Sequence, residues 1–404
     1  MGTQQDMLVA QSPERSAISE ARGRVAVVAP TPSVLKLLLP EIDIPGVAFG
    51  KGGGGAELQA TRIGQALAER GWDVIFVIKN WGQSEQQVSD RIRIINAHDG
   101  LGRGGGAWGL VGHVLPRYWS ALRRADADLY FHRGLSSFAG WSALFCRNHA
   151  RKLVISLASN MDVNRPGEGP VHEFKGFERR LAEYAKKHAA LTVAQTRHQQ
   201  ELYQAQYRPR CIRIPNMVEI GPEPGPCAQE PLILWAGSMR PGKRPEMALE
   251  VAVRLPEVRF ALAGGPVRGG DAYFEGLCEQ AARLPNVEML GWVPQEHMRE
   301  QYERAWGLLM TAPPDREGFP NVLLQAWERG RPTVSSFEPD QIMEEQGIGF
   351  RAQTVEEMAE ALRLLCHDPA TAQRMGQAAR QYAIAHHSPQ AIATAWDQAL
   401  VALL

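Results

Sequence analysis

Three basic residues crowd the entrance of one predicted helix in the second half of the chain. Arg240, Lys243 and Arg244 lie between an apolar run at 232–236 and a helix that begins near Pro245. The positive end of a helix dipole does not stabilise cations, so a bound polyanion such as a diphosphate explains their place better. Ordinary solvated charges remain the alternative interpretation.

A carboxylate precedes another predicted helix. Glu317 stands just before a segment in which Pro320 suits the first helical turn and Gly330 ends the helix. One role for Glu317 is a helix cap. The exposed backbone amides of residues 318–322 also predict a second anion site at this helix start.

A glycine-rich run at 50–57 lies between the first predicted strand and the first clear helix. Backbone amides and the helix dipole converge on an anion at such a place, so we predict a close approach of ligand to Gly53 and Gly54. A flexible connector is the alternative. Dinucleotide and P-loop interpretations are weakened, because Glu57 or Leu58 occupies the third glycine position of Gly-x-Gly-x-x-Gly and no Gly-Lys-Ser/Thr follows.

Other polar residues predict no metal site. Asp126 and Asp128 have the spacing of metal ligands but precede a strand, where a solvated turn is favoured. The five cysteines are scattered without a Cys-x-x-Cys pair, which excludes a cysteine cage and a disulfide framework and favours a reducing cytoplasm. His132 is either a structural histidine or part of a cleft. His386 and His387 are predicted to lie at the surface.

Size and composition indicate a two-domain globular enzyme. The chain has 404 residues, of which 44% are hydrophobic and 22% charged. Lys plus Arg and Asp plus Glu both number 44, so there is no basic field for nucleic acid, and we predict no nucleic-acid partner. Short apolar runs alternate with helical patterns, which predicts two parallel sheets covered by helices. These runs are 25–29, 74–78, 129–131, 153–157, 191–194, 211–214, 232–236, 260–263, 287–290, 307–310 and 333–335.

The predicted domains follow from these runs. Residues 1–23 are expected to be a disordered leader, and a first Rossmann-like domain covers 24–218. The Gly- and Pro-rich stretch 219–230 resists helix and strand and is the predicted linker. A second Rossmann-like domain covers 231–385, and an amphipathic helix in 386–404 is expected to cross back to the first domain.

Membrane insertion is not expected. The polar leader lacks a signal peptide, and the longest apolar segment, 138–146, is too short to span a bilayer. Residues 113–124 combine Leu, Tyr and Trp with three arginines, as in a helix that lies on an anionic membrane. Packing on a sheet is the commoner role of such a helix. We therefore predict a cytoplasmic protein, with peripheral contact at the inner membrane face as an alternative.

Several motifs in order resemble the retaining GT-B glycosyltransferases of family four, also called glycosyl transferases group 1. The resemblance covers nearly the whole chain, and its motifs are specific together although each is weak alone. They are Gly-Gly-Ala-Glu at 54–57, Glu-Arg-Gly-Trp-Asp-Val at 69–74, Ile-Pro-Asn at 214–216, Lys-Arg-Pro at 243–245, Ala-Gly-Gly at 263–265, Leu-Gly-Trp-Val-Pro at 290–294 and Glu-Gly-Phe-Pro-Asn-Val-Leu-Leu at 317–324.

The resemblance implies a GT-B fold, with two doubly wound domains facing a central cleft, and a retaining sugar transfer from a nucleoside diphosphate to an acceptor hydroxyl. The first domain would receive a sugar, lipid-linked or small-molecule acceptor, as in cell-surface polysaccharide or glycolipid synthesis. Arg240, Lys243 and Glu317 are the implied catalytic residues, without metal or cofactor. The implied donor-binding residues are Gly53, Gly54, Gly237, Gly265, Trp292, Val293, Gly318, Phe319, Pro320, Asn321, Val322 and Gln325.

Three positions depart from the family pattern. Ser238 stands where the family has an arginine, so Arg240 would serve from two residues later. Gln325 replaces the second glutamate of the paired motif, and the histidine often found after the fourth strand is absent from 156–162. A non-catalytic nucleotide-sugar-binding subunit therefore remains an alternative, as does another GT-B enzyme such as an epimerase or phosphorylase.

Overall fold

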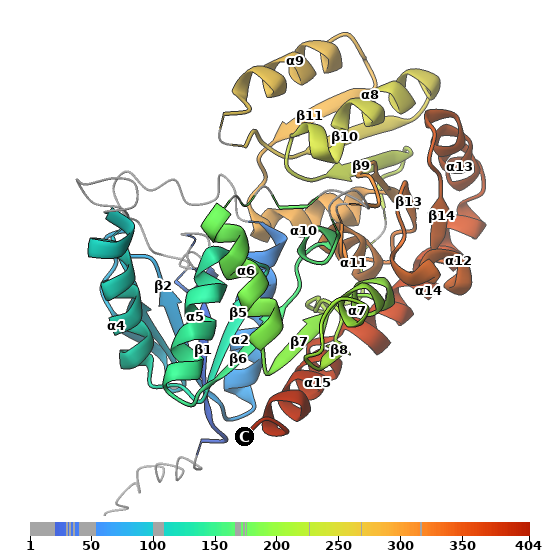
Figure 1. Ribbon diagram of the computed structural model, residues 1–404. Coiled ribbons are helices and arrows are strands. Elements are labelled where there is room, and N and C mark those ends of the chain that lie inside the picture. Colours follow the sequence, from blue (N-terminus) through green and yellow to red (C-terminus); the bar gives the residue numbers. More distant parts are fainter. Residues whose placement is uncertain are drawn as a thin grey trace, which may run out of the picture.

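A computed structural model describes most of the chain. The described residues are 21–29, 31, 34, 37–39, 54–99, 109–165, 171–172, 174, 176–225, 227–267, 269–315 and 317–404. Gly53 and residues 1–20 of the predicted leader lie outside this part. The described residues form two lobes, each built on one sheet (Figure 1).

The first sheet has eight strands in the order β3-β4-β2-β1-β5-β6-β7-β8. All neighbours are parallel except β3, which runs antiparallel to β4. The central strands are apolar and buried on both faces, as helices on both sides require. The strands are β1 Arg24–Val28, β2 Asp73–Ile78, β3 Gln86–Ser89, β4 Ile92–Asn96, β5 Leu129–Arg133, β6 Lys152–Ser156, β7 Leu191–Ala194 and β8 Cys211–Arg213.

Helices cover both faces of this sheet. The core on one face joins α2 (Gly55–Glu69) to the C-terminal helix α15 (Pro389–Val401). The core on the other face contains buried side chains of four further helices. These are α4 Leu115–Ala125, α5 Ser137–Asn148, α6 Gly176–His188 and α7 Arg197–Gln204.

The second sheet has six parallel strands in the order β11-β10-β9-β12-β13-β14. The strands are β9 Leu232–Ala236, β10 Arg259–Ala263, β11 Val287–Gly291, β12 Gly307–Met310, β13 Thr333–Ser335 and β14 Gly349–Arg351. One face is covered by α8 Pro245–Arg254, α9 Asp271–Ala281 and α13 Val355–His367. The other is covered by α10 Gln295–Arg304, α11 Asn321–Glu328, α12 Ile342–Gln346 and α14 Pro369–His387.

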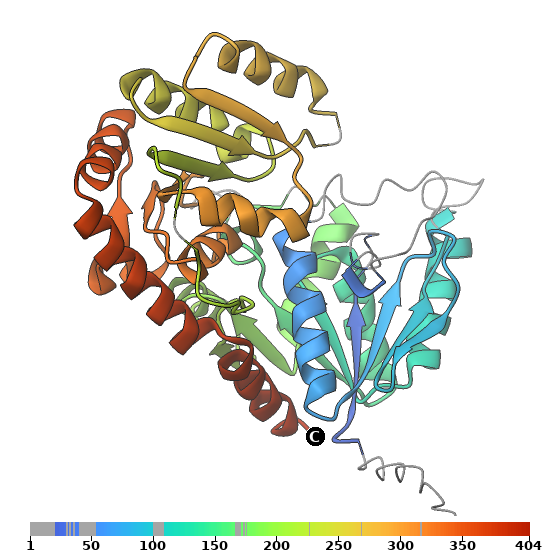
Figure 2. The same ribbon diagram turned by 180° about the vertical axis from the view of Figure 1, so that it is seen from behind.

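The chain crosses between the lobes a second time at its C-terminal end. Helix α14 lies on the second domain, and α15 continues from it along the first (Figure 2). Trp396 on α15 packs edge-on against Phe131 of β5, with ring centroids 5.3 Å apart. Asp397 accepts a 2.8 Å hydrogen bond from the Trp72 indole. Helix α15 is therefore part of the first hydrophobic core.

Both doubly wound sheets predicted from the apolar runs are confirmed, and two details are corrected. Pro320 precedes helix α11 as its N-cap rather than lying in its first turn. His387 is buried, because α14 ends against the first domain and the His387 Nδ1 contacts the Asn216 carbonyl at 2.8 Å. His386, one residue earlier, is exposed as predicted.

Candidate functional site

Lys243 and Glu317 meet at the centre of the second sheet. Strands β9 and β12 are neighbours there, and the connections that follow them lead to opposite halves of the sheet, a place where open α/β sheets bind ligands. Lys243 follows β9, Glu317 follows β12, and the Lys243 Nζ forms an ion pair with a Glu317 carboxylate oxygen. The two side chains keep 23% and 13% of their exposure. The pair is thus partly desolvated but open to a ligand.

A buried threonine holds the loop that carries Lys243. The Thr311 hydroxyl at the end of β12 donates to the Lys243 carbonyl at 2.8 Å and accepts from the Trp235 indole at 2.9 Å. Arg244, the next residue, has a left-handed backbone with φ of 51°. Neither Thr311 nor Trp235 was predicted as a site residue, because the only sequence signal of each is a position at the end of a predicted strand.

Arg240 occupies a different position from Lys243. It is exposed, in the N-cap position of the short turn Pro241–Lys243, and its side chain forms no hydrogen bond to any described residue. The two cations flank one helix entrance as predicted. The structure pairs only Lys243 with Glu317.

Glycines bring three strand ends close together. A Cβ atom on Gly264 would lie 1.8 Å from the Gly237 carbonyl oxygen, and one on Gly265 would lie 3.1 Å from Trp292 Cβ. The Gly237 amide donates to the Ala263 carbonyl at 3.0 Å. The predicted donor-binding positions after β9, β10 and β11 are therefore neighbours. Trp292 keeps 47% of its exposure at this edge.

Val293, the residue after Trp292, is half-buried. It packs against the core between the second sheet and helices α10 and α11. Its side chain is therefore part of the domain's packing, and only its backbone remains for the role implied by the family resemblance.

The segment 318–320, just before α11, contacts the first domain. The Phe319 amide donates to the Gln195 Oε1 at 2.9 Å, and a Cβ on Gly318 would lie 2.7 Å from the side chains of Gln195 and Gln199. The Phe319 ring is buried in the core of the second domain. The Phe319 amide is thus unavailable to an anion, which corrects the prediction for this residue. No described residue accepts a hydrogen bond from the amides of Asn321 and Val322, which begin α11.

The Asn321 side chain bridges the two domains. Its Nδ2 donates to the Gly55 carbonyl at 3.0 Å, and its Oδ1 accepts from Gln59 at 3.0 Å and from Asn216 at 3.1 Å. Gly54, the N-cap of α2, therefore lies next to the start of α11. The sequence analysis assigned Asn321 to the donor and missed the two amides that hold it.

A tyrosine holds the predicted ribose residue. The Tyr302 hydroxyl on α10 donates to the Gln325 Oε1 on α11 at 3.0 Å. Tyr302 is buried, whereas Gln325 is half-buried. Gln325 therefore lies where α10 and α11 pack together, and its amide already has one fixed partner.

The first domain has a different set of polar residues at its central strand ends. Arg133 at the end of β5 donates to the Ser156 hydroxyl at 2.6 Å and to the Asn216 Oδ1 at 2.5 Å. Burial lowers the Arg133 pKa to about 10. His132 contacts the Ser142 hydroxyl at 2.8 Å, and burial lowers its pKa to about 3. His132 is thus a neutral, hydrogen-bonded histidine.

Two features that the sequence left open take part in packing or ion pairs of the first domain. Asp126 and Asp128 form a turn whose carboxylates pair with Arg24 and Arg151. Helix α4 buries its apolar side, including Tyr118, against the first sheet. Among the described residues there is neither a cluster of three or more potential metal ligands nor a helix long and apolar enough to cross a membrane.

Both halves of the chain match models of known protein families. Residues 53–221 match the model of Glycosyltransferase Family 4, and residues 220–382 match that of Glycosyl transferases group 1. By fold and by family, this is a protein of the GT-B glycosyltransferase type. Sucrose-phosphate synthase from Thermosynechococcus elongatus has the same fold, with a TM-score of 0.77, 17% identity and coverage of 94% of this chain and 99% of that one.

Further relatives of this GT-B protein either match a shorter part of its sequence or have a lower structural similarity. HepE from Anabaena, solved with UDP and glucose, has a TM-score of 0.71 at 17% identity, covering 94% of this chain and 100% of that one. A D-inositol 3-phosphate glycosyltransferase from Streptomyces avermitilis is 35% identical over 172 residues, 38% of this chain. The sulfoquinovosyl transferase SQD2 from Arabidopsis thaliana is 31% identical over 161 residues, also 38% of this chain. The matched segments span 36% and 30% of those two relatives.

Proposed function

We propose that this protein transfers a sugar from a nucleoside diphosphate donor to an acceptor hydroxyl with retention of anomeric configuration. The observation that carries the proposal is the Lys243–Glu317 pair at the centre of the second sheet. A donor diphosphate that binds there contacts the Lys243 ammonium, on a loop that the Thr311 hydroxyl holds through the Lys243 carbonyl. Fixed cations stabilise the negative charge that grows on a departing diphosphate.

The neighbouring residues take the remaining donor roles. Arg240 supplies a second cation from the same loop, and the amides of Asn321 and Val322 supply donors at the start of α11. Glu317 contacts the donor sugar, and the backbone at Trp292 and Val293 receives the base. The leaving phosphate itself helps to deprotonate the acceptor hydroxyl, and Arg240 and Lys243 neutralise the diphosphate charge in place of a metal.

The acceptor binds at the carboxyl edge of the first sheet. A small cavity there is lined by Val28, Val77, Lys79, Ala97, His98, Tyr118, His132, Ser136 and Phe138. Its volume of about 20 Å³ is too small for a sugar, so it marks this edge of the sheet and is not itself the acceptor site. The proposed acceptor is a sugar, a lipid-linked sugar or a small molecule. The resemblance to family four, whose members build such products, supports a role in cell-surface polysaccharide or glycolipid synthesis.

A thermal-shift screen of UDP-, GDP- and ADP-sugars identifies the donor, because a ligand at a hundred times its dissociation constant stabilises a protein by about 2.7 kcal/mol. Turnover is then measured as nucleotide release with a panel of sugar acceptors, and NMR of the product gives the anomeric configuration. We expect donor-dependent release and a retained anomer.

The departures at Ser238 and Gln325 favour one rival, a subunit that binds nucleotide sugars without turning them over. Donor binding without nucleotide release for any acceptor supports that rival. Product with inverted configuration contradicts the retaining mechanism. Lys243→Met is the matched inactive control in both assays.

A further inference from the structure

The hydroxyl of Tyr302 has one hydrogen-bond partner among the described residues. That partner is the Gln325 Oε1, 3.0 Å away. Tyr302 is 2% exposed, and burial raises its pKa, so the hydroxyl stays protonated. A buried hydroxyl that has a single partner satisfies its hydrogen only by donating to it. Tyr302 is therefore the donor and Gln325 the acceptor.

This bond sets the orientation of the Gln325 amide. With the amide reversed, the Nε2 would donate to the Tyr302 oxygen and the tyrosine hydrogen would lose its acceptor. In the observed orientation the Nε2 donates to no residue in the described part of the chain. It is also not fully buried, since the fully buried side-chain atoms without a partner do not include it. The Gln325 Nε2 is thus open to a ligand, with both of its hydrogens available.

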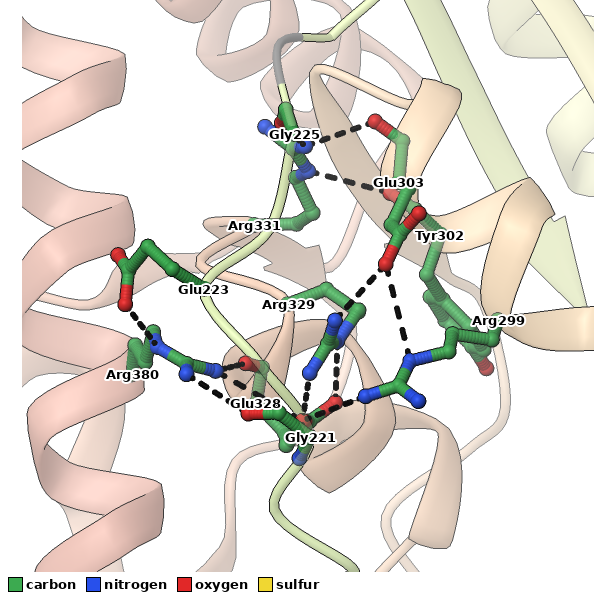
Figure 3. Close-up of polar contacts among 10 residues, drawn as sticks. All are labelled: Gly221, Glu223, Gly225, Arg299, Tyr302, Glu303, Glu328, Arg329, Arg331 and Arg380. Carbon is green, nitrogen blue, oxygen red and sulfur yellow. Dashed lines mark hydrogen bonds and ion pairs between the residues drawn. The ribbon is translucent and has the colours of Figure 1, made fainter.

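The two helices that carry this pair are locked together. Figure 3 shows the arginines after α11 reaching back to the end of α10. Arg331 donates to the Tyr302 carbonyl at 3.1 Å and to the Glu303 carbonyl at 2.7 Å, and Arg329 pairs with the Glu303 carboxylate at 2.8 Å. Arg329 is only 1% exposed. Tyr302 is therefore held in place on both its backbone and its side chain.

The linker between the domains is anchored to the same region by Glu328, Arg331 and Arg380. The Gly221 amide donates to the Glu328 carboxylate at 2.6 Å, and Arg380 donates to the Gly221 carbonyl at 3.0 Å. Arg331 reaches the Gly225 carbonyl at 3.2 Å (Figure 3). Tyr302 and the linker thus share one scaffold, which keeps the hydroxyl fixed relative to the rest of the second domain.

We propose that Tyr302 is a positioning residue which makes Gln325 recognise the donor ribose as a hydrogen-bond donor. The inference rests on the proposed function, because it places the ribose beside Gln325. The Nε2 donates to a ribose hydroxyl oxygen, whereas a carboxylate at this position only accepts. The polarity of ribose recognition is therefore reversed in this chain, and Tyr302 maintains it by fixing the orientation in which the Nε2 faces the ligand.

The test measures the affinities of UDP, 2′-deoxy-UDP and 3′-deoxy-UDP by calorimetry, with GDP and ADP and their deoxy forms in parallel. A neutral hydrogen bond predicts that the wild-type protein binds the ribonucleotide about five- to tenfold tighter than one of its deoxy forms. Gln325→Met lowers this affinity ratio to about one, because methionine cannot donate a hydrogen bond to the ribose. Tyr302→Phe frees the amide to rotate and lowers the ratio to about twofold.

Tyr273→Phe is the matched control. The Tyr273 hydroxyl on α9 also donates to a side-chain oxygen within the second domain, that of Glu246 at 2.5 Å, but it does not touch Gln325. This variant keeps the wild-type ratio. Melting temperatures of all variants separate a loss of folding from a loss of discrimination, because a purely structural role of Tyr302 lowers the melting temperature and leaves the ratio unchanged.

The inference is overturned if Tyr302→Phe binds UDP with the wild-type ratio, or if Gln325→Met keeps it. The second variant decides the matter should Tyr302→Phe fail to fold. If none of the three nucleoside diphosphates binds the wild-type protein, the proposed function fails instead. The two failures are thus distinguishable.

Discussion

The centres of the two sheets can be compared strand for strand. Strands β1 and β5 meet in the first sheet as β9 and β12 do in the second, with the same order of neighbours around them. In the first domain Arg133 ends β5, and its guanidinium meets the neutral oxygens of Ser156 and Asn216. In the second domain Lys243 meets the carboxylate of Glu317.

The difference shows that topology determines where a ligand binds and side chains determine which charge it carries. Lys243 has a partner that a diphosphate can replace or join, in a loop held by Thr311. In the first domain the Arg133 guanidinium contacts only the uncharged Ser156 and Asn216 side chains, and burial lowers the His132 pKa to about 3, so the histidine stays neutral. The cation of the second domain thus lies beside a carboxylate, whereas the cation of the first domain is held by uncharged side chains.

The largest expected effect comes from removing the charge that distinguishes the second domain. Lys243→Met is predicted to lower kcat about ten- to a thousandfold, the scale of a lost preorganised electrostatic contact. Arg240→Ala is expected at the lower end of this range, because Arg240 is exposed. Steady-state nucleotide release measures both. Arg259→Met, at an exposed position on β10, is the control, and unchanged turnover in both site variants contradicts the assignment.

Lowering the pH is predicted to destabilise the first domain before the second. His132 has a folded pKa of about 3 and His387, at the domain junction, one of about 4, both depressed by burial from 6.5. Their contribution to stability is complete above pH 6.5 and falls as the pH drops towards the folded values, because the unfolded chain binds the protons first. Lowering the pH from 7 to 5 therefore reduces the free energy of unfolding by about 2 kcal/mol for each histidine.

Hydrogen exchange at the two pH values measures this difference. We expect β5 and β6 to lose protection while β9 and β12 keep theirs. His132→Leu reduces the loss in the first domain, whereas His386→Leu, at an exposed position, does not. Equal loss in both sheets would show that the neutral histidines do not distinguish the domains.

A smaller effect is expected from adding a charge to the second domain. In Gln325→Glu one carboxylate oxygen takes the Tyr302 hydrogen bond and the other accepts from the ribose. A charge-assisted bond then tightens donor binding by about 1 to 2 kcal/mol. Calorimetry with UDP and 2′-deoxy-UDP measures the gain, which the deoxy form loses. Unchanged or abolished affinity places Gln325 outside the ribose site.

No effect is expected from removing divalent metal. If Lys243 and Arg240 neutralise the diphosphate, the rate in EDTA equals the rate without it. Turnover assays with EDTA and with added magnesium or manganese measure this. Strict restoration by either metal points to a cation that bridges the donor phosphates, and the comparison of the two domains then loses its basis.

Local patterns in the sequence determined most of the fold. The apolar runs at 74–78 and 307–310 predicted β2 and β12 correctly, since burial on both faces demands continuous hydrophobicity over a few residues. Strands β3, β4 and β14 were not predicted. β4 mixes Arg93 and Asn96 with isoleucines, and β14 has only three residues. β3 and β14 are edge strands, which carry a weaker signal because they are less fully buried, whereas β4 lies inside its sheet.

The candidate site was predicted residue by residue but not as a set of contacts. Lys243 and Glu317 were identified from their helix entrances, yet their pairing joins positions 74 residues apart. Nothing in the local pattern around Asn321 separates a donor-binding residue from one that bridges to Gly55. Both outcomes depend on how the segment before α11 packs against the first domain.

What the sequence by itself determined is the existence and order of most strands and helices, because periodicity, glycine and proline act within a few residues. The tertiary structure alone decided the burial of His387 and the orientation of Gln325. His387 is buried because α15 continues from α14 onto the first domain, and Gln325 is oriented because α10 brings Tyr302 against α11. Such contacts depend on the packing of whole helices, which no local sequence window contains.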